Sequence, residues 1–199
     1  MTTWHWVRHG PTHEKTLVGW RDVPADLSDH AQIARLNAHL PRDAILVSSD
    51  LIRAAATADV LAHPQRRRLP HDEKLREMDF GEWDGMHARD VSEQHPELSR
   101  AYWSTPGDVA PPQGESWNAA ARRVNAHLVP AEAMPAVACN PVDGEEVPAA
   151  HFGVILTQIQ RALNISAHAA FAHKIDNLSA TQITVSQAQW DVTHINHSP

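Results

Sequence analysis

Residues 4–12 read Trp4-His5-Trp6-Val7-Arg8-His9-Gly10-Pro11-Thr12, an apolar run that leads directly into an arginine, a histidine and two chain-breaking residues. The run predicts a short β-strand, because bulky aromatic and β-branched side chains favour extended structure. Gly10 and Pro11 end any regular element. Arg8 and His9 are therefore expected where this strand stops.

Helical and strand patterns alternate downstream of this strand. A helix is expected over about residues 28–40, with apolar side chains at spacings of three and four and an N-cap at Ser28 or Asp29. Residues 44–47 form a compact apolar run that is typical of a buried parallel strand. Strong helix formers then predict a helix over about residues 54–61.

The second half of the chain continues the alternation. Residues 76–117 are polar and rich in Gly, Pro and Trp, so we expect them to leave the sheet as a lid-like excursion. We expect this excursion to lie over the active site, whose residues are identified below. The other expected elements are a helix from 115 to about 133, a strand just before His151, a helix over 154–163 and strands over 181–185 and 190–195. This order predicts an α/β fold, a three-layer α/β/α sandwich with a mostly parallel central sheet. In such sheets ligands bind beyond the carboxyl ends of the strands.

Composition narrows the class of protein. The 199 residues, 42% of them hydrophobic, are enough for a single domain over residues 1–199 with its own core, which excludes a disordered chain. A formal net charge of −7 argues against a protein that mainly binds nucleic acid or an anionic membrane. Cys139 is the only cysteine, so no intramolecular disulfide can form. No stretch approaches the ~20 apolar residues of a membrane span, and no signal peptide is evident, so we expect a cytoplasmic location.

Basic side chains and imidazoles follow three of the expected strands. Arg8 and His9 leave the first strand, Arg53 lies in the first helical turn after the second, and His151 follows a later one. The carboxyl ends of parallel strands meet at one edge of a sheet, and a helix N-terminus there also attracts anions. The pattern therefore predicts an oxyanion site of about the size of a phosphate group.

These residues carry a resemblance to a known family. Arg8-His9-Gly10-Pro11-Thr12 resembles the signature Arg-His-Gly-Glu-Thr of the histidine phosphatase superfamily, the phosphoglycerate mutase-like proteins. Further blocks match the family in type and order: Gly19-Trp20-x-Asp22-Val23-Pro24, Ser48-Ser49-x-x-x-Arg53-Ala54-x-x-Thr57, Leu75-x-Glu77-x-x-x-Gly81-x-Trp83-x-Gly85, Gly114-Glu115-Ser116, His151-x-Gly153-Val154-Ile155 and Asn177-x-Ser179. An isolated Arg-His-Gly would be weak evidence for the family, whereas ordered blocks over nearly the whole chain are specific to it.

The resemblance implies a role for each matching residue. His9 is expected as the nucleophile that becomes a phosphohistidine, and Glu77 as the general acid and base. Arg8, Arg53 and His151 are expected to bind the phosphate oxygens, together with Gly10 and Thr12. Because a carboxyl group beside two arginines normally stays ionised, we expect Glu77 to gain its proton only when a dianionic substrate binds. The implied activity is hydrolysis of a small phosphomonoester, with no metal and no cofactor.

The sequence also departs from the family pattern. Pro11 stands where many members have Glu, and Lys15 stands where several have a phosphate-contacting Asn. Lys15, Trp20 and Phe152 are expected to shape the substrate pocket. Before His151 only residues 147–150 are apolar, and Pro148 interrupts them, so the register of that strand is open.

Alternatives remain for individual residues. Asp79, Glu82 and Asp84 compete with Glu77 as the acid, and Arg53 could instead pair with Asp50 or Asp59 on a solvated helix face. His151 could be an ordinary buried histidine. The fifteen histidines invite a metal site, but their spacing favours scattered surface positions.

Two further functions stay open at this point. One is a phosphoglycerate mutase, which the chain length disfavours because the mutases of the superfamily resemble longer chains. The other is a catalytically silent protein that binds a phosphorylated ligand. The expected partner is a small phosphorylated metabolite, with neither nucleic acid nor membrane, and a homodimer is one option for the oligomeric state.

Overall fold

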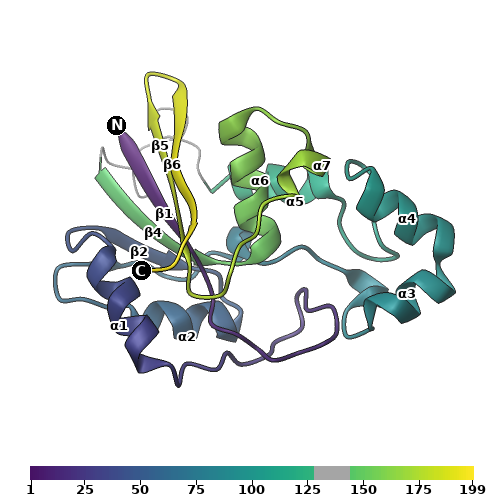
Figure 1. Ribbon diagram of the computed structural model, residues 1–199, viewed down its shortest axis with the longest axis horizontal. Helices are drawn as coiled ribbons and strands as arrows, with labels where there is room; N and C mark the ends of the chain where they lie inside the picture. The colour runs from purple at the N-terminus through teal and green to yellow at the C-terminus, as the bar shows by residue number, and fades with distance from the viewer. Residues whose placement is uncertain (128–143) are drawn as a thin grey trace.

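The computed structural model describes residues 1–127 and 144–199, which build a six-stranded sheet with helices on both sides (Figure 1). The sheet order is β3-β2-β4-β1-β5-β6. The strands are β1 (Thr2–Arg8), β2 (Ile45–Ser48), β3 (Arg67–Arg68), β4 (Gly144–Ala150), β5 (Ala180–Ser186) and β6 (Gln189–His197). The α-helices are α1 (His30–His39), α2 (Ile52–Val60), α3 (Ala88–Gln94), α4 (Pro96–Ser104), α5 (Trp117–Asn125), α6 (Phe152–Leu163) and α7 (Ala167–Ala170). The described residues also include two 3₁₀ turns, η1 (Glu73–Leu75) and η2 (Gly81–Trp83).

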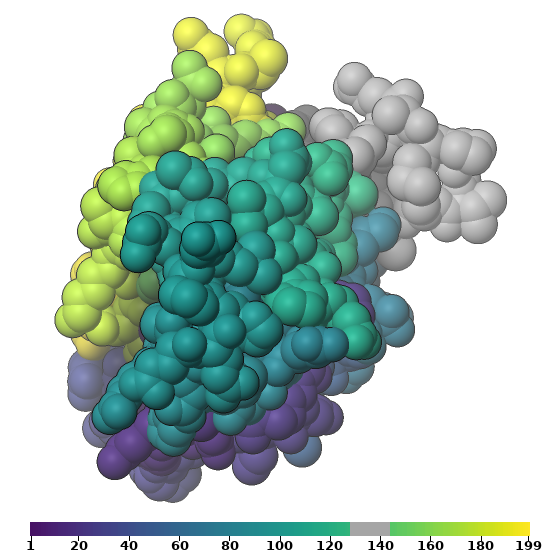
Figure 2. Space-filling model, turned by 90° about the vertical axis from the view of Figure 1, so that its right-hand side faces the viewer, coloured from purple at the N-terminus to yellow at the C-terminus, as the bar shows by residue number. Residues whose placement is uncertain are grey.

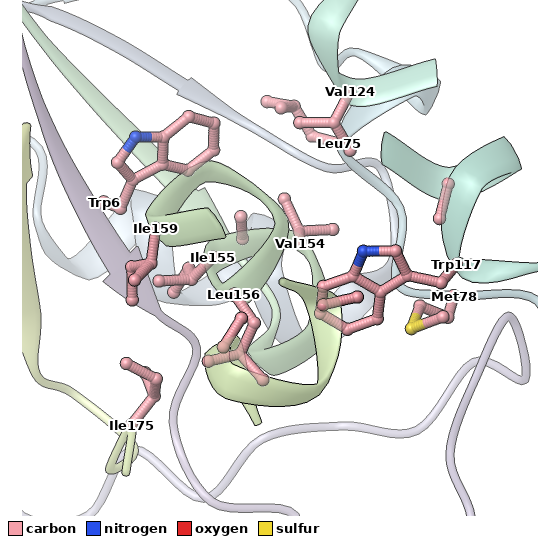
Figure 3. Close-up of a cluster of buried hydrophobic side chains, with 14 of the residues drawn as sticks. Trp6, Leu75, Met78, Trp117, Val124, Val154, Ile155, Leu156, Ile159 and Ile175 are labelled. Atoms are coloured by element: carbon pink, nitrogen blue, oxygen red, sulfur yellow. The ribbon is translucent and has the colours of Figure 1, made fainter. Parts of the chain in front are cut away.

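Alternation along β1 directs its side chains to the two faces of the sheet. Trp4 and Trp6 belong to the larger core, which α5 and α6 cover and which Figure 3 shows around Trp6, Ile155 and Trp117. Val7 belongs to the other core, where it packs with Leu36 and other residues of α1, α2 and the sheet. Because a strand points successive side chains to opposite faces, one short sequence serves both layers. The three-layer α/β/α prediction is confirmed.

Parallel pairing brings the carboxyl ends of the central strands together. β1 pairs with β4 in parallel, with Arg8 opposite Ala150, and β4 pairs with β2 in parallel, with Ser48 opposite Ala149. β5 runs antiparallel to β1, and β6 runs antiparallel to β5. The predicted mostly parallel sheet is confirmed, and the residues that follow β1, β2 and β4 leave at one edge.

β4 is longer than its apolar residues indicated. It begins at Gly144 and includes Glu145 and Glu146, whose carboxylates accept hydrogen bonds from His5 (2.6 Å) and His127 (2.9 Å). Buried or half-buried carboxylates are tolerated in a strand when donors from neighbouring elements satisfy them. Pro148 pairs with β2, and the ladder to β1 is interrupted beside it, as expected for a residue without an N–H.

The helix predictions are confirmed with shifted ends. α1 begins after Asp29, whose side chain accepts from the N–H of Gln32, so Asp29 is the N-cap and Ser28 is not. The helix expected over 54–61 is α2, and that expected over 154–163 is α6. α5 begins after the N-cap Ser116 and ends at Asn125, so it is shorter than the helix expected over 115–133, whose last residues lie outside the described part of the chain.

The segment 76–117 leaves the sheet and carries η2, α3 and α4. Figure 2 shows its residues, in teal, over the centre of the face that is turned to the viewer. Tyr102 and Trp83 anchor it, because both side chains are buried in the larger core. No helix in the described ranges 1–127 and 144–199 combines the length and hydropathy needed to cross a membrane.

A half-buried histidine just after α5 contacts the sheet and predicts a pH-dependent stability. His127 donates to Asp72 (2.6 Å) and to Glu146 (2.9 Å). Burial alone would lower its pKa, but these two carboxylates outweigh burial and raise the pKa to about 9. His127 therefore stabilises the fold fully below its unfolded pKa of about 6.5, and this stability is lost as the pH rises through about 9.

We expect the free energy of unfolding to fall between pH 6.5 and pH 10 by a contribution on the order of 3 kcal/mol from this residue. Urea unfolding of the wild type and of His127→Gln at several pH values measures it, and the variant should lose most of this pH dependence. His168→Gln, an exposed histidine on α7, is the control. Equal pH dependence in wild type and His127→Gln would contradict the assignment.

Candidate active site

The strand ends place two histidines side by side. His9 follows β1, and its backbone N–H donates to the carbonyl of Ala150 (3.0 Å), directly before His151. The two imidazole rings lie 5.1 Å apart between centroids and are tilted by 58°. This proximity results from the parallel register of β1 and β4, in which Arg8 faces Ala150.

The His9 ring is held in one tautomer. Nδ1 lies 2.7 Å from the carbonyl oxygen of Gly10, and since a carbonyl only accepts, Nδ1 carries the proton. Nε2 then keeps its lone pair, and His9 lines a cavity. Burial lowers the pKa of His9 to about 3, with Arg53 and Arg8 adding to the effect against the Gly10 hydrogen bond. His9 is thus an unprotonated imidazole at neutral pH.

Two arginines, the half-buried Arg8 and the buried Arg53, reach the same cavity from different elements. Arg53, on α2, is 1% exposed and donates to the carbonyls of Gly19 (2.6 Å) and Arg21 (3.0 Å). Arg8 donates to the carbonyl of Ile175 (2.6 Å). Among the described residues neither guanidinium forms an ion pair with a carboxylate, so both positive charges remain available to an anion.

The alternative pairings of Arg53 are wrong. Asp50 forms its ion pair with Arg76, and Asp59 forms its own with Arg68. The start of α2 also differs from expectation, because the N–H of Ile52 donates to the Asp22 carboxylate (2.7 Å). α2 therefore contributes the side chain of Arg53 to the site rather than this N–H group.

His151 is fully buried behind the cavity wall. Within residues 1–127 and 144–199 neither of its ring nitrogens has a hydrogen-bond partner, and the same holds for Nε of Arg8. Burial, followed by Arg53 and His9, lowers the pKa of His151 well below its ordinary value, so the ring is neutral. Buried polar atoms without partners are costly and are usually satisfied by a ligand or by water. A neutral imidazole can donate one N–H to an oxyanion.

Glu77 is the buried carboxyl group of the cavity. The N–H of Gly153 donates to both of its oxygens (3.0 and 3.2 Å), and the N–H of Met78 donates to Oε1 (3.0 Å). Burial raises the pKa of Glu77 and outweighs these hydrogen bonds and the charges of Arg53 and Arg8. Removal from water therefore outweighs the two arginines and raises the proton affinity of this carboxyl group before any substrate binds.

The competing carboxylates have other partners. Asp79 accepts from the N–H of Gly81 (2.9 Å), and Glu82 accepts from the Gln113 amide (2.7 Å). Asp84 accepts from the N–H groups of Gly19 (3.1 Å) and Arg21 (2.8 Å). Of these carboxyl groups, Glu77 is the one that lines the cavity.

The nucleophile candidate, the two arginines and Glu77 all line one cavity of about 290 Å³. Its charged and polar lining includes Arg8, His9, Thr12, Arg53 and Glu77. Apolar side chains make much of the remaining wall, Met78, Phe80, Trp103, Phe152 and Phe171 among them. Segment 76–117 contributes Glu77, Met78, Phe80 and Trp103, so the excursion forms one side of the cavity.

The predicted binding residues divide into two groups. Thr12 and Phe152 line the cavity, and the Phe152 ring lies 5.3 Å from the Arg8 guanidinium carbon. Lys15 is exposed outside it, and its carbonyl accepts from His87 (3.2 Å). Lys15 does not line this cavity, and its role in the substrate pocket stays a prediction.

Gly10 also lies outside the cavity lining, and the glycine is required by packing. A Cβ at this position would lie 2.7 Å from Leu27 Cδ2 and 2.9 Å from the Asp26 carbonyl. Its N–H donates to the hydroxyl of Thr57 (3.0 Å). Gly153 is different, because a Cβ there would lie 2.6 Å from the Glu77 carboxylate. The second glycine is what lets Glu77 approach its N–H.

Trp20 contacts the main chain of Glu77 and does not line this cavity, so its role in the substrate pocket stays a prediction. Its indole N–H donates to the backbone carbonyl of Glu77 (2.7 Å). Arg123 donates to the same carbonyl (3.1 Å), and its guanidinium carbon lies 5.8 Å from the Trp20 ring. Trp20 and Arg123 therefore fix the main chain that carries the acid.

Sequence reasoning missed several residues of the site. Glu14, Thr16, Trp103 and Phe171 line the cavity and were not singled out as site residues. Asn177, whose amide donates to the His9 carbonyl (2.7 Å), did lie in a matching block, so its position carried a signal. The other four residues lie in loops or in short helices, where no periodic pattern predicts the direction of a side chain.

Comparison with known proteins identifies relatives over the whole described fold. The model of the histidine phosphatase superfamily (branch 1) matches residues 5–198. The bifunctional protein Rv2228c of Mycobacterium tuberculosis is 36% identical over 107 residues, which are 54% of this chain and 27% of that protein. This chain thus matches about a quarter of the length of that relative. The probable phosphoglycerate mutase GpmB of Klebsiella pneumoniae is 26% identical over 92% of this chain and 85% of its own.

A solved structure is similar to this chain in both fold and sequence. The mycobacterial glucosyl-3-phosphoglycerate phosphatase Rv2419c, in its complex with VO3, superposes with a TM-score of 0.81 at 26% identity and covers 98% of this chain and 99% of its own. The match of the family model to nearly the whole sequence establishes the relationship. This chain belongs to branch 1 of the histidine phosphatase superfamily.

Proposed function

We propose that this protein is a phosphatase that hydrolyses a small phosphomonoester through a phosphohistidine on His9. The observation that carries the proposal is one cavity that holds an unprotonated imidazole, a carboxyl group with a raised pKa and two arginines that form no ion pair with a carboxylate of the described residues. These are a nucleophile, a charge clamp and an acid, the three parts that phosphoryl transfer requires.

In the first step, Nε2 of His9 attacks phosphorus and forms a P–N bond while the P–O bond to the alcohol breaks. Glu77 gives its proton to the departing oxygen, so the alcohol leaves neutral. In the second step, a water molecule attacks the phosphohistidine and gives a proton to the Glu77 carboxylate. The P–N bond breaks, inorganic phosphate is released, and both residues return to their starting states.

In this proposal Arg8 and Arg53, which line the cavity, hold the charge on the phosphoryl oxygens, together with His151, which is not itself part of the lining. The backbone carbonyl of Ile175 holds the guanidinium of Arg8, and that of Gly19 holds the guanidinium of Arg53. Each guanidinium is therefore fixed before the substrate binds. Donors that are already positioned cost no reorganisation during the reaction. Because these side chains supply the charge stabilisation, we expect chelators to leave the activity unchanged.

Relatives of this chain support hydrolysis and also name one alternative. The mycobacterial relative is a phosphatase whose structure holds VO3, an anion that resembles a transferring phosphoryl group. GpmB is described as a probable phosphoglycerate mutase, so transfer of the phosphoryl group to a second hydroxyl is the competing reaction. A silent phosphate-binding protein would bind substrate without forming a covalent bond.

Rapid-quench labelling with ³²P-phenyl phosphate tests the proposal. We expect an acid-labile, base-stable phosphoprotein whose label maps to the peptide that contains His9, and release of one inorganic phosphate for each phenol. Incubation with 3-phosphoglycerate and detection of the 2-isomer on the same preparation measures mutase activity. Formation of the 2-isomer without release of phosphate would show that the protein is a mutase. Binding of phenyl phosphate without labelling of the protein would show that it is catalytically silent.

A further inference from the structure

The wall of the cavity beyond the reacting groups is aromatic. Phe80 and Trp103 come from segment 76–117, Phe152 begins α6, and Phe171 follows α7 as its C-cap. The Trp103 ring lies 6.2 Å from Phe80 and 6.0 Å from Phe171, so three of the rings form a continuous surface where α4 and α7 approach one another (Figure 1). All four side chains keep some exposure or lie at the limit of burial, which leaves their faces available to a ligand.

One charged residue outside the reaction centre lines the same cavity. Glu14 accepts from Arg21 Nη2 (3.2 Å) and from the hydroxyl of Thr16 (3.1 Å), both at Oε2. These hydrogen bonds lower its pKa, so Glu14 is a carboxylate at neutral pH. Arg21 itself is not part of the lining.

The charges of the cavity lining therefore favour a substrate with one anionic group, the phosphate, and disfavour a substrate with a second. Among the described lining residues Arg8 and Arg53 are the cations, and both serve the phosphate in the proposed mechanism. A carboxylate or second phosphate on the leaving group would meet Glu14 and the aromatic rings instead. Removing a charge from water without a partner is costly, whereas an aromatic ring gains from burial and from edge or stacked contacts.

We propose that the leaving group of the substrate is an aromatic or apolar alcohol without a second negative charge, and that Glu14 excludes anionic leaving groups. This inference rests on the proposed phosphatase activity at the same cavity. It assigns Trp103 and Phe171 to binding of the alcohol and Glu14 to selectivity.

Three substrates that all leave as primary alcohols test the inference, because they separate recognition from leaving-group reactivity. They are 2-phenylethyl phosphate, glycerol 3-phosphate and 3-phosphoglycerate. We expect kcat/KM for 2-phenylethyl phosphate to exceed that for 3-phosphoglycerate by at least about 30-fold, the effect of burying one aromatic ring, with glycerol 3-phosphate between them.

Variants then separate the charge of Glu14 from the aromatic wall. Glu14→Gln should lower the ratio of the two kcat/KM values by about three- to tenfold, since the carboxylate is exposed and screened by salt. Arg21→Gln removes its cationic partner and should raise the ratio. Glu93→Gln deletes the same charge on the exposed face of α3 and should leave the ratio unchanged. Trp103→Ala should lower kcat/KM for 2-phenylethyl phosphate more than that for glycerol 3-phosphate.

The outcomes distinguish this inference from the proposed function. If the wild type hydrolyses 3-phosphoglycerate as well as 2-phenylethyl phosphate, the substrate class is wrong while the phosphatase stands. An unchanged ratio in Glu14→Gln overturns the role of that residue. If none of the three is hydrolysed and His9 takes no label from ³²P-phenyl phosphate, both proposals are overturned.

Discussion

Replacement of His9 by alanine is expected to lower kcat/KM for phenyl phosphate by at least about 10³-fold, because the variant has no atom that can form the P–N bond. The arginines and Glu77 remain, so phosphate binding should persist while turnover and ³²P labelling disappear. Steady-state kinetics, labelling and equilibrium binding of inorganic phosphate measure the three effects. The fold should survive, since β1 keeps its pairing with β4 and β5.

His13→Ala is the matched control for this variant. His13 lies four residues further along the same loop, is exposed and pairs with Asp26 (2.8 Å) outside the cavity. Its kcat/KM should stay within about twofold of the wild type, because surface changes of this kind have small effects. Activity of His9→Ala above about a tenth of the wild type would remove His9 as the nucleophile.

The fold was largely predictable because its signals are local. The apolar runs of β1 and β2 and the periodic residues of α1 and α6 each lie within a dozen residues. β4 was the exception, since Glu145 and Glu146 are accommodated by His5 and His127, which arrive from other elements. Single-sequence patterns carry no information about such partners.

The residues of the candidate site also divide into those with a local sequence signal and those placed by contacts with other elements. Arg8, His9 and Arg53 follow directly from the strand ends, whose meeting point is a property of parallel sheets. Lys15 and Trp20 lie in the irregular loop between β1 and α1, where side-chain direction depends on contacts such as the one from Trp20 to the Glu77 carbonyl. Trp103 and Phe171 reach the cavity only through the packing of α4 and α7.

The environment of Glu77 decides which protonation state the free protein presents. Two arginines and three N–H contacts favour the carboxylate, yet burial outweighs them and raises the pKa. A raised pKa favours retention of the proton, which is the direction that a general acid requires. The wild-type kcat/KM for an alkyl phosphate should therefore fall as the pH rises through this raised pKa, while His9 stays unprotonated down to about pH 3.

Glu77→Gln is expected to reduce kcat/KM for 2-phenylethyl phosphate by about 10²- to 10⁴-fold, the range for loss of a general acid, and that for 4-nitrophenyl phosphate by less than about tenfold. Nitrophenolate leaves without a proton, whereas a primary alkoxide does not. Since kcat/KM reports only the steps up to loss of the alcohol, the comparison isolates proton donation. The amide is isosteric and can still accept from the N–H groups of Met78 and Gly153.

The same variant should change the second step as well. Without a base to activate water, phosphohistidine is expected to accumulate during turnover of 4-nitrophenyl phosphate, which rapid-quench labelling detects as a larger labelled fraction than in the wild type. The pH dependence of kcat/KM for the alkyl substrate should also vanish. Glu82→Gln removes a carboxylate from the same segment, where it accepts from Gln113 outside the cavity, and should change neither measurement. Equal losses on the alkyl and nitrophenyl substrates, without accumulation of phosphohistidine, would show that Glu77 positions the site and does not transfer the proton.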